Sequence, residues 1–140
     1  MIQPGERIFV DTGAWIAAAV VADTHHDDAT ALWTELMAQG GRPLTSVPVI
    51  IETFTYMQRG LGPEVAQAWR SAISTTPRLA VLDCTAADLA AAWPWLERRD
   101  LRKLGLVDAT SFVLMKKHKL RRVFTFDAHF AVAGFNVLRP

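Results

Sequence analysis

The sequence of 140 residues lacks the features that mark secreted and membrane proteins. It has a single cysteine, Cys84, so no disulfide can form within the chain, which suits a reducing cytosol. Its longest apolar run, from Ala14 to Ala22, is far shorter than the roughly 20 residues that a membrane-spanning helix needs. Residues 1–7 lack the charged and then apolar pattern of a signal peptide. We therefore expect a cytoplasmic protein with no membrane partner.

The chain also lacks an excess of charge of either sign. It has 15 Lys and Arg residues against 14 Asp and Glu residues, a net charge of +1. Composition alone therefore does not predict a nucleic-acid partner, and any binding of a polyanion would need a local cluster of positive charge. The hydrophobic content of 51% supports a packed core. Because no repeat, low-complexity segment or long linker interrupts the chain, we expect a single domain over residues 1–140.

Four acidic residues stand out because each lies in an apolar frame. They are Asp11, Glu52, Asp108 and Asp127. A carboxylate that is buried alone is costly, so it usually has a partner. Four carboxylates that converge would repel one another, and some would stay protonated unless a cation joined them. The pattern therefore favours a hard divalent metal and chemistry on phosphates. Taken singly, each acid could instead be a helix cap or a surface charge.

Hydrophobic periodicity predicts strands that alternate with helices. The expected strands are residues 8–11, 43–46, 78–82, 123–126 and 136–138. The expected helices are residues 14–22 and 25–39, one that starts at Pro48 and breaks at 60–63, then 64–75, 85–98 with a kink or restart at Pro94, and 107–119. This alternation predicts right-handed crossovers and a parallel sheet.

The order of the elements places the four acids together. Asp11 and Asp127 follow strands, whereas Glu52 and Asp108 lie near the starts of helices that come after a strand or loop. Ligands of parallel sheets bind beyond the carboxyl ends of the strands. We therefore expect all four side chains at one edge of the sheet.

Four strings of residues resemble a known family. They are Phe9 to Ala14, Ile51-Glu52, Leu106 to Phe112 and Thr125 to Phe130. The strings resemble the PIN-domain family, and they look most like its bacterial and archaeal VapC-type toxins. The closing Ala133-Gly134-Phe135 before the last strand is also similar. The similarity covers essentially the whole chain, and its C-terminal third is the most specific part.

The resemblance implies an α/β fold with a small parallel sheet flanked by helices in a Rossmann-like three-layer sandwich. It implies an endoribonuclease that depends on Mg²⁺ or Mn²⁺ and acts as the toxin of a toxin–antitoxin pair. Matched by position, Asp11, Glu52, Asp108 and Asp127 form the metal site, with Asp11 and Asp108 as principal ligands. Thr125 matches a supporting hydroxyl residue. The implied partners are an RNA substrate, a cognate antitoxin and a second copy of the chain.

The sequence departs from the family pattern at three places. Relatives often carry Ser or Thr where Gly105 and Val107 stand, and Ala128 replaces a residue that is commonly basic. These departures concern hydrogen bonds around the carboxylates and contacts with the substrate, and they leave the four acids intact.

Two basic clusters are candidates for RNA contact. One combines Arg98-Arg99 with Arg102-Lys103, and the other spans residues 116–122. Within the second cluster we expect Lys116, Lys117 and Lys119 to bind substrate, which would make binding depend on salt. The alternative is that both clusters are solvated helix C-termini, where positive charge suits the helix dipole.

Three further features each have two interpretations. The run from Asp23 to Asp28 suits a capped, exposed helix start better than a transition-metal site. His129 could orient substrate, although packing beside Phe130 is the expected role. Most of the five tryptophans suit the core, and Trp93 and Trp95 are the best candidates for a contact with a second copy or an antitoxin.

Other function classes compete with a nuclease toxin. A PIN-type nuclease could process RNA without a toxin role, and a catalytically silent PIN-like module could act only through its partner. A phosphoacceptor receiver domain is also doubly wound and acidic. That chemistry needs an acidic pair after the first strand and a lysine after a late strand. Here Asp11 alone follows the first strand, and no lysine takes the second place.

Overall fold

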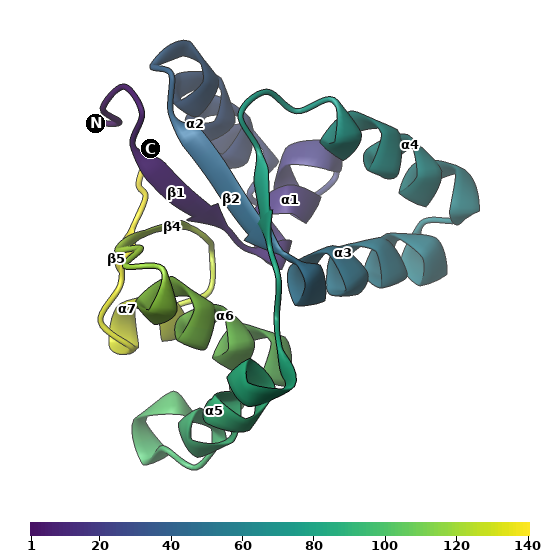
Figure 1. Cartoon of the computed structure of the whole chain (residues 1–140). Helices are drawn as coiled ribbons and strands as arrows, with labels where there is room; N and C mark the ends of the chain where they lie inside the picture. The colour runs from purple at the N-terminus through teal and green to yellow at the C-terminus, as the bar shows by residue number, and fades with distance from the viewer.

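Five parallel strands form one sheet in a computed structural model that describes all residues from 1 to 140. The strands are β1 (Arg7–Val10), β2 (Arg42–Ser46), β3 (Ala80–Leu82), β4 (Arg122–Phe124) and β5 (Asn136–Val137). Their order across the sheet is β3-β2-β1-β4-β5, and every neighbouring pair is parallel (Figure 1). The predicted strands and their parallel arrangement are confirmed.

Seven α-helices and one short 3₁₀ helix flank the sheet. They are α1 (Thr12–Ala19), α2 (His26–Ala38), α3 (Val47–Gly60), α4 (Pro63–Ser74), α5 (Ala86–Leu96), η1 (Arg99–Leu101), α6 (Leu106–Lys117) and α7 (His129–Val132). Figure 1 shows α1 and α2 on one face of the sheet and α6 and α7 on the other. The predicted α/β architecture with helices on both faces is confirmed. None of the helices combines the length and the apolar surface needed to cross a bilayer.

The strand order reverses at β1. The chain builds β1, β2 and β3 toward one edge and then returns to place β4 on the other side of β1. In open parallel sheets such a reversal leaves a crevice at the carboxyl ends of the two strands, and ligands bind there. This order differs from the 2-1-3-4-5 order of receiver-type domains. The phosphoacceptor alternative therefore loses its structural basis. The crevice at the reversal lies between Asp11 after β1 and Thr125 after β4.

Aromatic side chains fill the core on both faces of the sheet. On one face, Trp15 packs 5.3 Å from Trp33 and 6.0 Å from Trp69, measured between ring centroids. The buried indole of Trp15 donates to Thr45 Oγ1 at 3.2 Å. On the other face, Phe112 lies edge to face with Phe130 at 4.9 Å. These contacts fix the helices against the strands whose ends carry the acidic residues.

Local capping signals start helices α3 and α5 where the sequence predicts. Ser46 accepts a hydrogen bond from Val49 N at the start of α3, and Thr85 forms a capping box with Asp88 at the start of α5. Pro94 lies in the last turn of α5 and does not interrupt it, since the helix ends two residues later. The predicted restart of the helix at Pro94 is therefore wrong.

Two short elements were not predicted, and strand β3 is two residues shorter than expected. Helices η1 and α7 contain three and four residues, too few to show a helical period. Strand β3 begins at Ala80 because Arg78 adopts φ 62°, outside the extended region. The Arg78 side chain donates to the carbonyls of Gly41 at 2.9 Å and Met37 at 3.1 Å. It thereby joins this turn to the end of α2.

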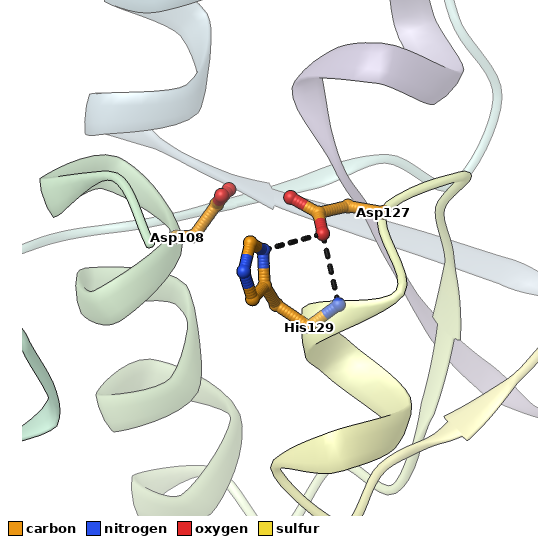
Figure 2. A group of neighbouring side chains, drawn as sticks. All are labelled: Asp108, Asp127 and His129. Carbon is orange, nitrogen blue, oxygen red and sulfur yellow. Dashed lines mark hydrogen bonds and ion pairs between the residues drawn. The ribbon is translucent and has the colours of Figure 1, made fainter. Parts of the chain in front are cut away.

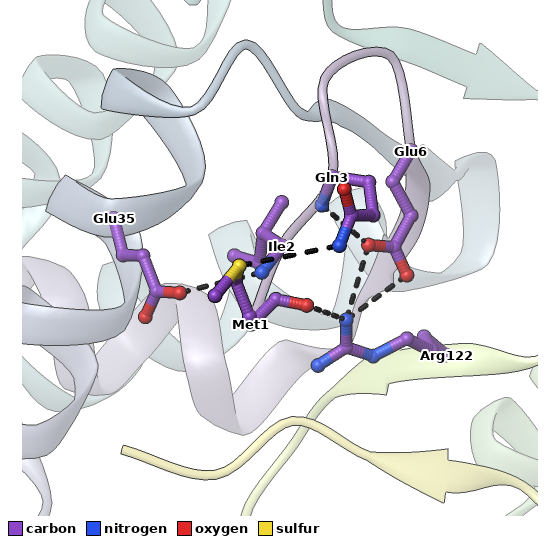
Figure 3. A network of polar contacts seen from close by, with 6 residues as sticks. All are labelled: Met1, Ile2, Gln3, Glu6, Glu35 and Arg122. Carbon is purple, nitrogen blue, oxygen red and sulfur yellow. Dashed lines mark hydrogen bonds and ion pairs between the residues drawn. The ribbon is translucent and has the colours of Figure 1, made fainter.

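The N-terminal segment is tied to the sheet through Arg122 (Figure 3). Arg122 Nη1 donates to both carboxylate oxygens of Glu6, at 3.1 and 3.0 Å, and to the carbonyl of Met1 at 2.9 Å. Ile2 is 1% exposed and belongs to the core. Arg122 is therefore a structural residue that fixes the first residues of the chain beside β4.

Candidate metal centre

Asp11 lies at the centre of the site because strand β1 ends directly before it, at Val10. Its backbone N donates to Phe124 O at 3.0 Å, so the strand pairing of β1 with β4 continues into this residue. Its side chain is buried, with 4% of the residue exposed, and forms no capping bond with α1. One carboxylate oxygen, Oδ2, accepts from Thr125, whereas Oδ1 is buried with no hydrogen-bond partner. A buried oxygen of this kind needs a proton or a cation.

Thr125 joins two of the predicted carboxylates. Its Oγ1 donates to Asp11 Oδ2 at 2.9 Å and accepts from Asp127 N at 3.0 Å. Thr125 is 2% exposed, so neither hydrogen bond competes with solvent. The predicted supporting hydroxyl therefore lies where it fixes Asp11 and the turn that carries Asp127.

Asp127 is held by the start of α7. Its Oδ1 accepts from His129 N at 2.8 Å and lies 2.7 Å from His129 Nδ1 (Figure 2). His129 Nε2 donates to the carbonyl of Arg102 at 2.7 Å. His129 thus bridges Asp127 and the loop after η1. Packing beside Phe130 was expected for His129, and sequence reasoning missed this positioning role. The Asp-x-His spacing at residues 127–129 was the available signal.

Asp108 enters the site from the first turn of α6. Ligand atoms of Asp108, Asp127 and His129 all lie within 4.8 Å of one another, close enough for one metal ion to contact them. Figure 2 shows Asp108 on the helix facing Asp127 and His129 across a small gap. Helix α6 and the turn after β4 therefore bring together residues that are about twenty positions apart in the sequence.

Glu52 borders the same hollow from α3. A cavity of about 350 Å³ is lined by Asp11, Thr12, Gly13, Ile16, His25, Glu52, Asp108, Phe126 and Asp127. The Glu52 side chain is exposed, in contrast to buried Asp11. All four predicted acids therefore meet at one edge of the sheet. His25 was not predicted there, although it stacks on Phe126 with ring centroids 4.3 Å apart and planes 6° from parallel.

The electrostatics of the cluster oppose full ionisation. Burial raises the pKa of Asp11 to about 7, although the hydrogen bond from Thr125 acts against this rise. Burial and the neighbouring charge of Asp11 raise the pKa of Asp108 to about 9. The charges of Asp127 and Glu52 push both pKa values in the same direction. A divalent cation would remove this repulsion.

The donor set fits a hard divalent metal. Asp11 offers a buried carboxylate oxygen with no other partner, and Asp108, Asp127 and Glu52 border the same hollow with further oxygen donors. Mg²⁺ and Mn²⁺ prefer such oxygen ligands and keep part of their water shell, for which the open cavity has room. The arrangement can therefore hold a cation beside bound phosphate.

The three predicted substrate lysines lie apart from the acids. Asp108 is in the first turn of α6, whereas Lys116 and Lys117 are in the last, roughly 12 Å along the helix. Lys117 Nζ donates to both carboxylate oxygens of Asp88, at 3.1 and 3.2 Å. The structure thus brings the acids together but does not bring these lysines to them. The run at residues 23–28 forms the start of α2, where His26 Nδ1 lies 2.7 Å from Ala17 O.

Gly105 is the departure from the family pattern that has a direct structural consequence. It is the N-cap of α6, and a Cβ there would lie 3.9 Å from Asp108 Oδ2. We expect Gly105→Ser to stabilise the protein by a few tenths of a kcal/mol, because a serine hydroxyl caps helices slightly better than glycine. Thermal unfolding measures this gain, and Gly105→Ala is the control. Equal melting temperatures for the two variants would contradict the capping argument.

Removal of the Thr125 hydroxyl should affect both stability and activity. Thr125→Val keeps the shape but leaves Asp127 N and Asp11 Oδ2 without their shared partner. We expect a loss of about 1–3 kcal/mol in the free energy of unfolding and a fall in RNA cleavage of roughly 10- to 100-fold. Urea unfolding and cleavage rates measure the two effects. Thr125→Ser retains the hydroxyl and should keep most of both; a serine variant as impaired as the valine variant would contradict this role.

Comparisons with known proteins match almost the whole chain. A family model described as PIN domain matches residues 8–136. The chain is 38% identical over 133 residues to the 23S rRNA-specific endonuclease VapC20 of Mycobacterium tuberculosis, covering 95% of this chain and 98% of that protein. The crystal structure of M. tuberculosis VapC20, described as a sarcin-ricin loop cleaving toxin, matches with a TM-score of 0.83 and 37% identity over 95% of this chain and 99% of that one.

A more distant structure shows that the same fold occurs in a complex. VapBC2 from Rickettsia felis, bound to a DNA fragment from its promoter, matches with a TM-score of 0.69 at 17% identity. The match covers 94% of this chain and 97% of that one, and it supports the fold alone. The family model and the M. tuberculosis relative both extend over almost the whole sequence. The protein therefore belongs to the PIN domain family.

Proposed function

We propose that the protein is a metal-dependent endoribonuclease that cleaves 23S rRNA and acts as the toxin of a toxin–antitoxin pair. One observation carries the catalytic part of the proposal: four carboxylates meet around one hollow, and Asp11 Oδ1 is buried with no hydrogen-bond partner. The RNA target is proposed from the similarity to VapC20, which extends over 95% of this chain. The sarcin–ricin loop is the proposed cleavage site, as in the similar toxin of known structure.

The side chains of the site have different proposed roles. Asp11 and Asp108 would hold Mg²⁺ or Mn²⁺ as principal ligands, and Glu52 and Asp127 would complete the cluster directly or through water. The ion, when bound, lowers the pKa of a coordinated water and offsets negative charge on the phosphate. Thr125 holds the Asp11 carboxylate in place, and His129 does the same for Asp127. Exposed Glu52 borders the open side, where it can orient water or RNA.

The proposed protein partners are a cognate antitoxin and a second copy of the chain, all in the cytoplasm. The exposed apolar side chains of Val47, Ile51, Leu89 and Leu106 line one hollow next to the carboxylate site and support a protein contact there. Sedimentation of the chain alone, and of the chain expressed with its antitoxin, measures both associations. A monomer at high micromolar concentration would contradict the second copy.

Cleavage of a defined RNA tests the proposed function. The purified chain is incubated with a stem-loop RNA of the 23S rRNA sarcin–ricin sequence and with a stem-loop of scrambled loop sequence. We expect one discrete cut in the first RNA with Mg²⁺ or Mn²⁺ and none with a chelator. No cut in any RNA from a folded chain that still binds the metal would contradict the nuclease and favour a binding module. Cuts in both RNAs would contradict the proposed target alone.

A further inference from the structure

Positive charge is concentrated in one stretch of this nearly neutral chain. Residues 98–122 contain nine of the 15 Lys and Arg residues but only two of the 14 Asp and Glu residues. This stretch thus has seven more basic than acidic residues, and the remainder has six more acidic than basic ones. The net charge of +1 therefore conceals a polarised molecule. Local concentration of this kind is what a polyanion needs in order to bind.

Three of these nine cations are neutralised by ion pairs within the chain. Arg98 pairs with Asp100, Lys117 with Asp88, and Arg122 with Glu6. No salt bridge involves the other six, which are Arg99, Arg102, Lys103, Lys116, Lys119 and Arg121. Three of these six line one cavity at the far end of α6.

The basic hollow lies at the opposite end of α6 from the carboxylates. Its volume is about 580 Å³, and it is lined by Lys116, Lys119, Leu120, Arg121, Ala133, Gly134, Phe135 and Asn136. No acidic side chain lines it. Lys119 and Arg121 are exposed, so their charged ends meet solvent around a concave surface. The size and the charge suit a phosphate group with its neighbouring sugar.

Lys119 occupies a backbone position that normally favours glycine. Its φ is 57°, in the left-handed region. It is the turning residue of a Schellman motif, in which Leu120 N donates to Met115 O at 2.7 Å and Lys119 N donates to Lys116 O at 3.2 Å. Arg78 has a similar φ, but its side chain makes structural hydrogen bonds, whereas Lys119 makes none. Because the Lys119 side chain makes no hydrogen bond or salt bridge, its charge is free to meet a ligand in the hollow.

An aromatic side chain adjoins the basic hollow. Lys116 Nζ, from the hollow, lies 5.3 Å from the ring centroid of Trp95, and Arg98 Cζ lies 5.0 Å from the same centroid. Arg98 leads into η1 and the following loop, where the carbonyl of Arg102 accepts from His129 in the site. One RNA strand or stem could contact both ends of α6.

We propose that the basic hollow binds a backbone phosphate of the RNA substrate, distant from the bond that is cleaved. The proposal rests on the proposed function for the identity of the ligand. It assigns the contact with the substrate to Lys116, Lys119 and Arg121. Lys117 is excluded from this contact because it pairs with Asp88. Because phosphate contacts carry no sequence information, the hollow adds affinity and register and leaves the choice of RNA to the region of the site.

Binding of uncut RNA tests the hollow. All proteins carry Asp11→Asn, which prevents cleavage, and the test variants add Lys119→Gly alone or with Arg121→Gln. The RNA probes are the sarcin–ricin stem-loop and an unrelated hairpin. We expect the double variant to bind both RNAs roughly fivefold or more weakly, with a shallower dependence of log Kd on log salt by about one unit per lost contact. Lys119→Gly relieves the left-handed strain, so its melting temperature should not fall.

A matched control separates the hollow from general loss of charge. Arg59→Gln with Arg70→Gln removes two exposed cations from α3 and α4, outside the basic stretch. RNA affinity that falls equally in both double variants, or in neither, would overturn the proposal. If Lys119→Gly with Arg121→Gln lost antitoxin binding but kept its RNA affinity, the proposal would also be overturned. The hollow would then be assigned to an acidic segment of a protein partner. Failure of the unmodified chain to cut RNA would contradict the proposed function. The binding experiment would still test the hollow, because it uses proteins that do not cleave.

Discussion

Asp11→Asn should abolish RNA cleavage and raise the stability of the metal-free protein. Asp11 is buried, and its Oδ1 lacks any hydrogen-bond partner within the folded chain. The asparagine keeps the oxygen that accepts from Thr125 and removes the charge that repels Asp127 and Glu52. We expect cleavage to fall by at least about 10³-fold, because a principal ligand and its electrostatic contribution are lost.

The gain in stability separates this explanation from simple damage to the fold. Near neutral pH, the variant should melt roughly 3 °C or more above the parent without metal, because it removes a buried charge and reduces the repulsion in the cluster. Added Mg²⁺ or Mn²⁺ should raise the melting temperature of the parent and leave that of the variant almost unchanged. Asp27→Asn, on the exposed first turn of α2, is the control. A variant that melts below its parent would contradict the idea that the Asp11 charge destabilises the metal-free fold.

The metal-free protein should lose stability as pH rises from about 5 to about 8. The pKa values of Asp11 and Asp108 are raised in the folded state to about 7 and about 9, from the ordinary value of 3.8. Between the unfolded and folded pKa values, the folded state binds more protons than the unfolded state, so the free energy of unfolding decreases with pH. The stability associated with each proton is present below about pH 4 and is lost as pH rises through the folded pKa.

A divalent metal should reverse this trend. Because the metal binds the ionised carboxylates, its stabilisation increases as the protons leave. Urea midpoints measured from about pH 5 to about pH 8, with a chelator and with millimolar Mg²⁺ or Mn²⁺, compare the two slopes. We expect the two curves to diverge by the equivalent of roughly 5–10 °C in melting temperature at the alkaline end. A metal-free curve that is flat or that rises with pH would show that burial and mutual repulsion do not raise the pKa of these carboxylates.

The fold and the carboxylate site could be predicted because each depends on local signals. Apolar β-branched runs followed by turns indicated the strands, and Ser46 and Thr85 marked helix starts through caps within three residues. The carboxyl ends of parallel strands meet at one edge, so Asp11 and the turn containing Asp127 had to lie close together. The errors were also local: α7 and η1 were too short to show a period, and Pro94 lies where α5 is already ending.

The sequence by itself determined the alternation of strands and helices, because periodicity and capping follow from short-range order. It also indicated the convergence of the four acids, because the carboxyl ends of parallel strands meet at one edge of a sheet. Only the tertiary structure decided which of the neighbouring groups are free to act. Lys117 is engaged by Asp88, which is 29 residues away, whereas Lys119 is left unpaired over a basic hollow. His129 reaches Arg102, which is 27 residues away. Such partnerships depend on how elements distant in sequence pack, and the spacing of residues along the chain does not encode them.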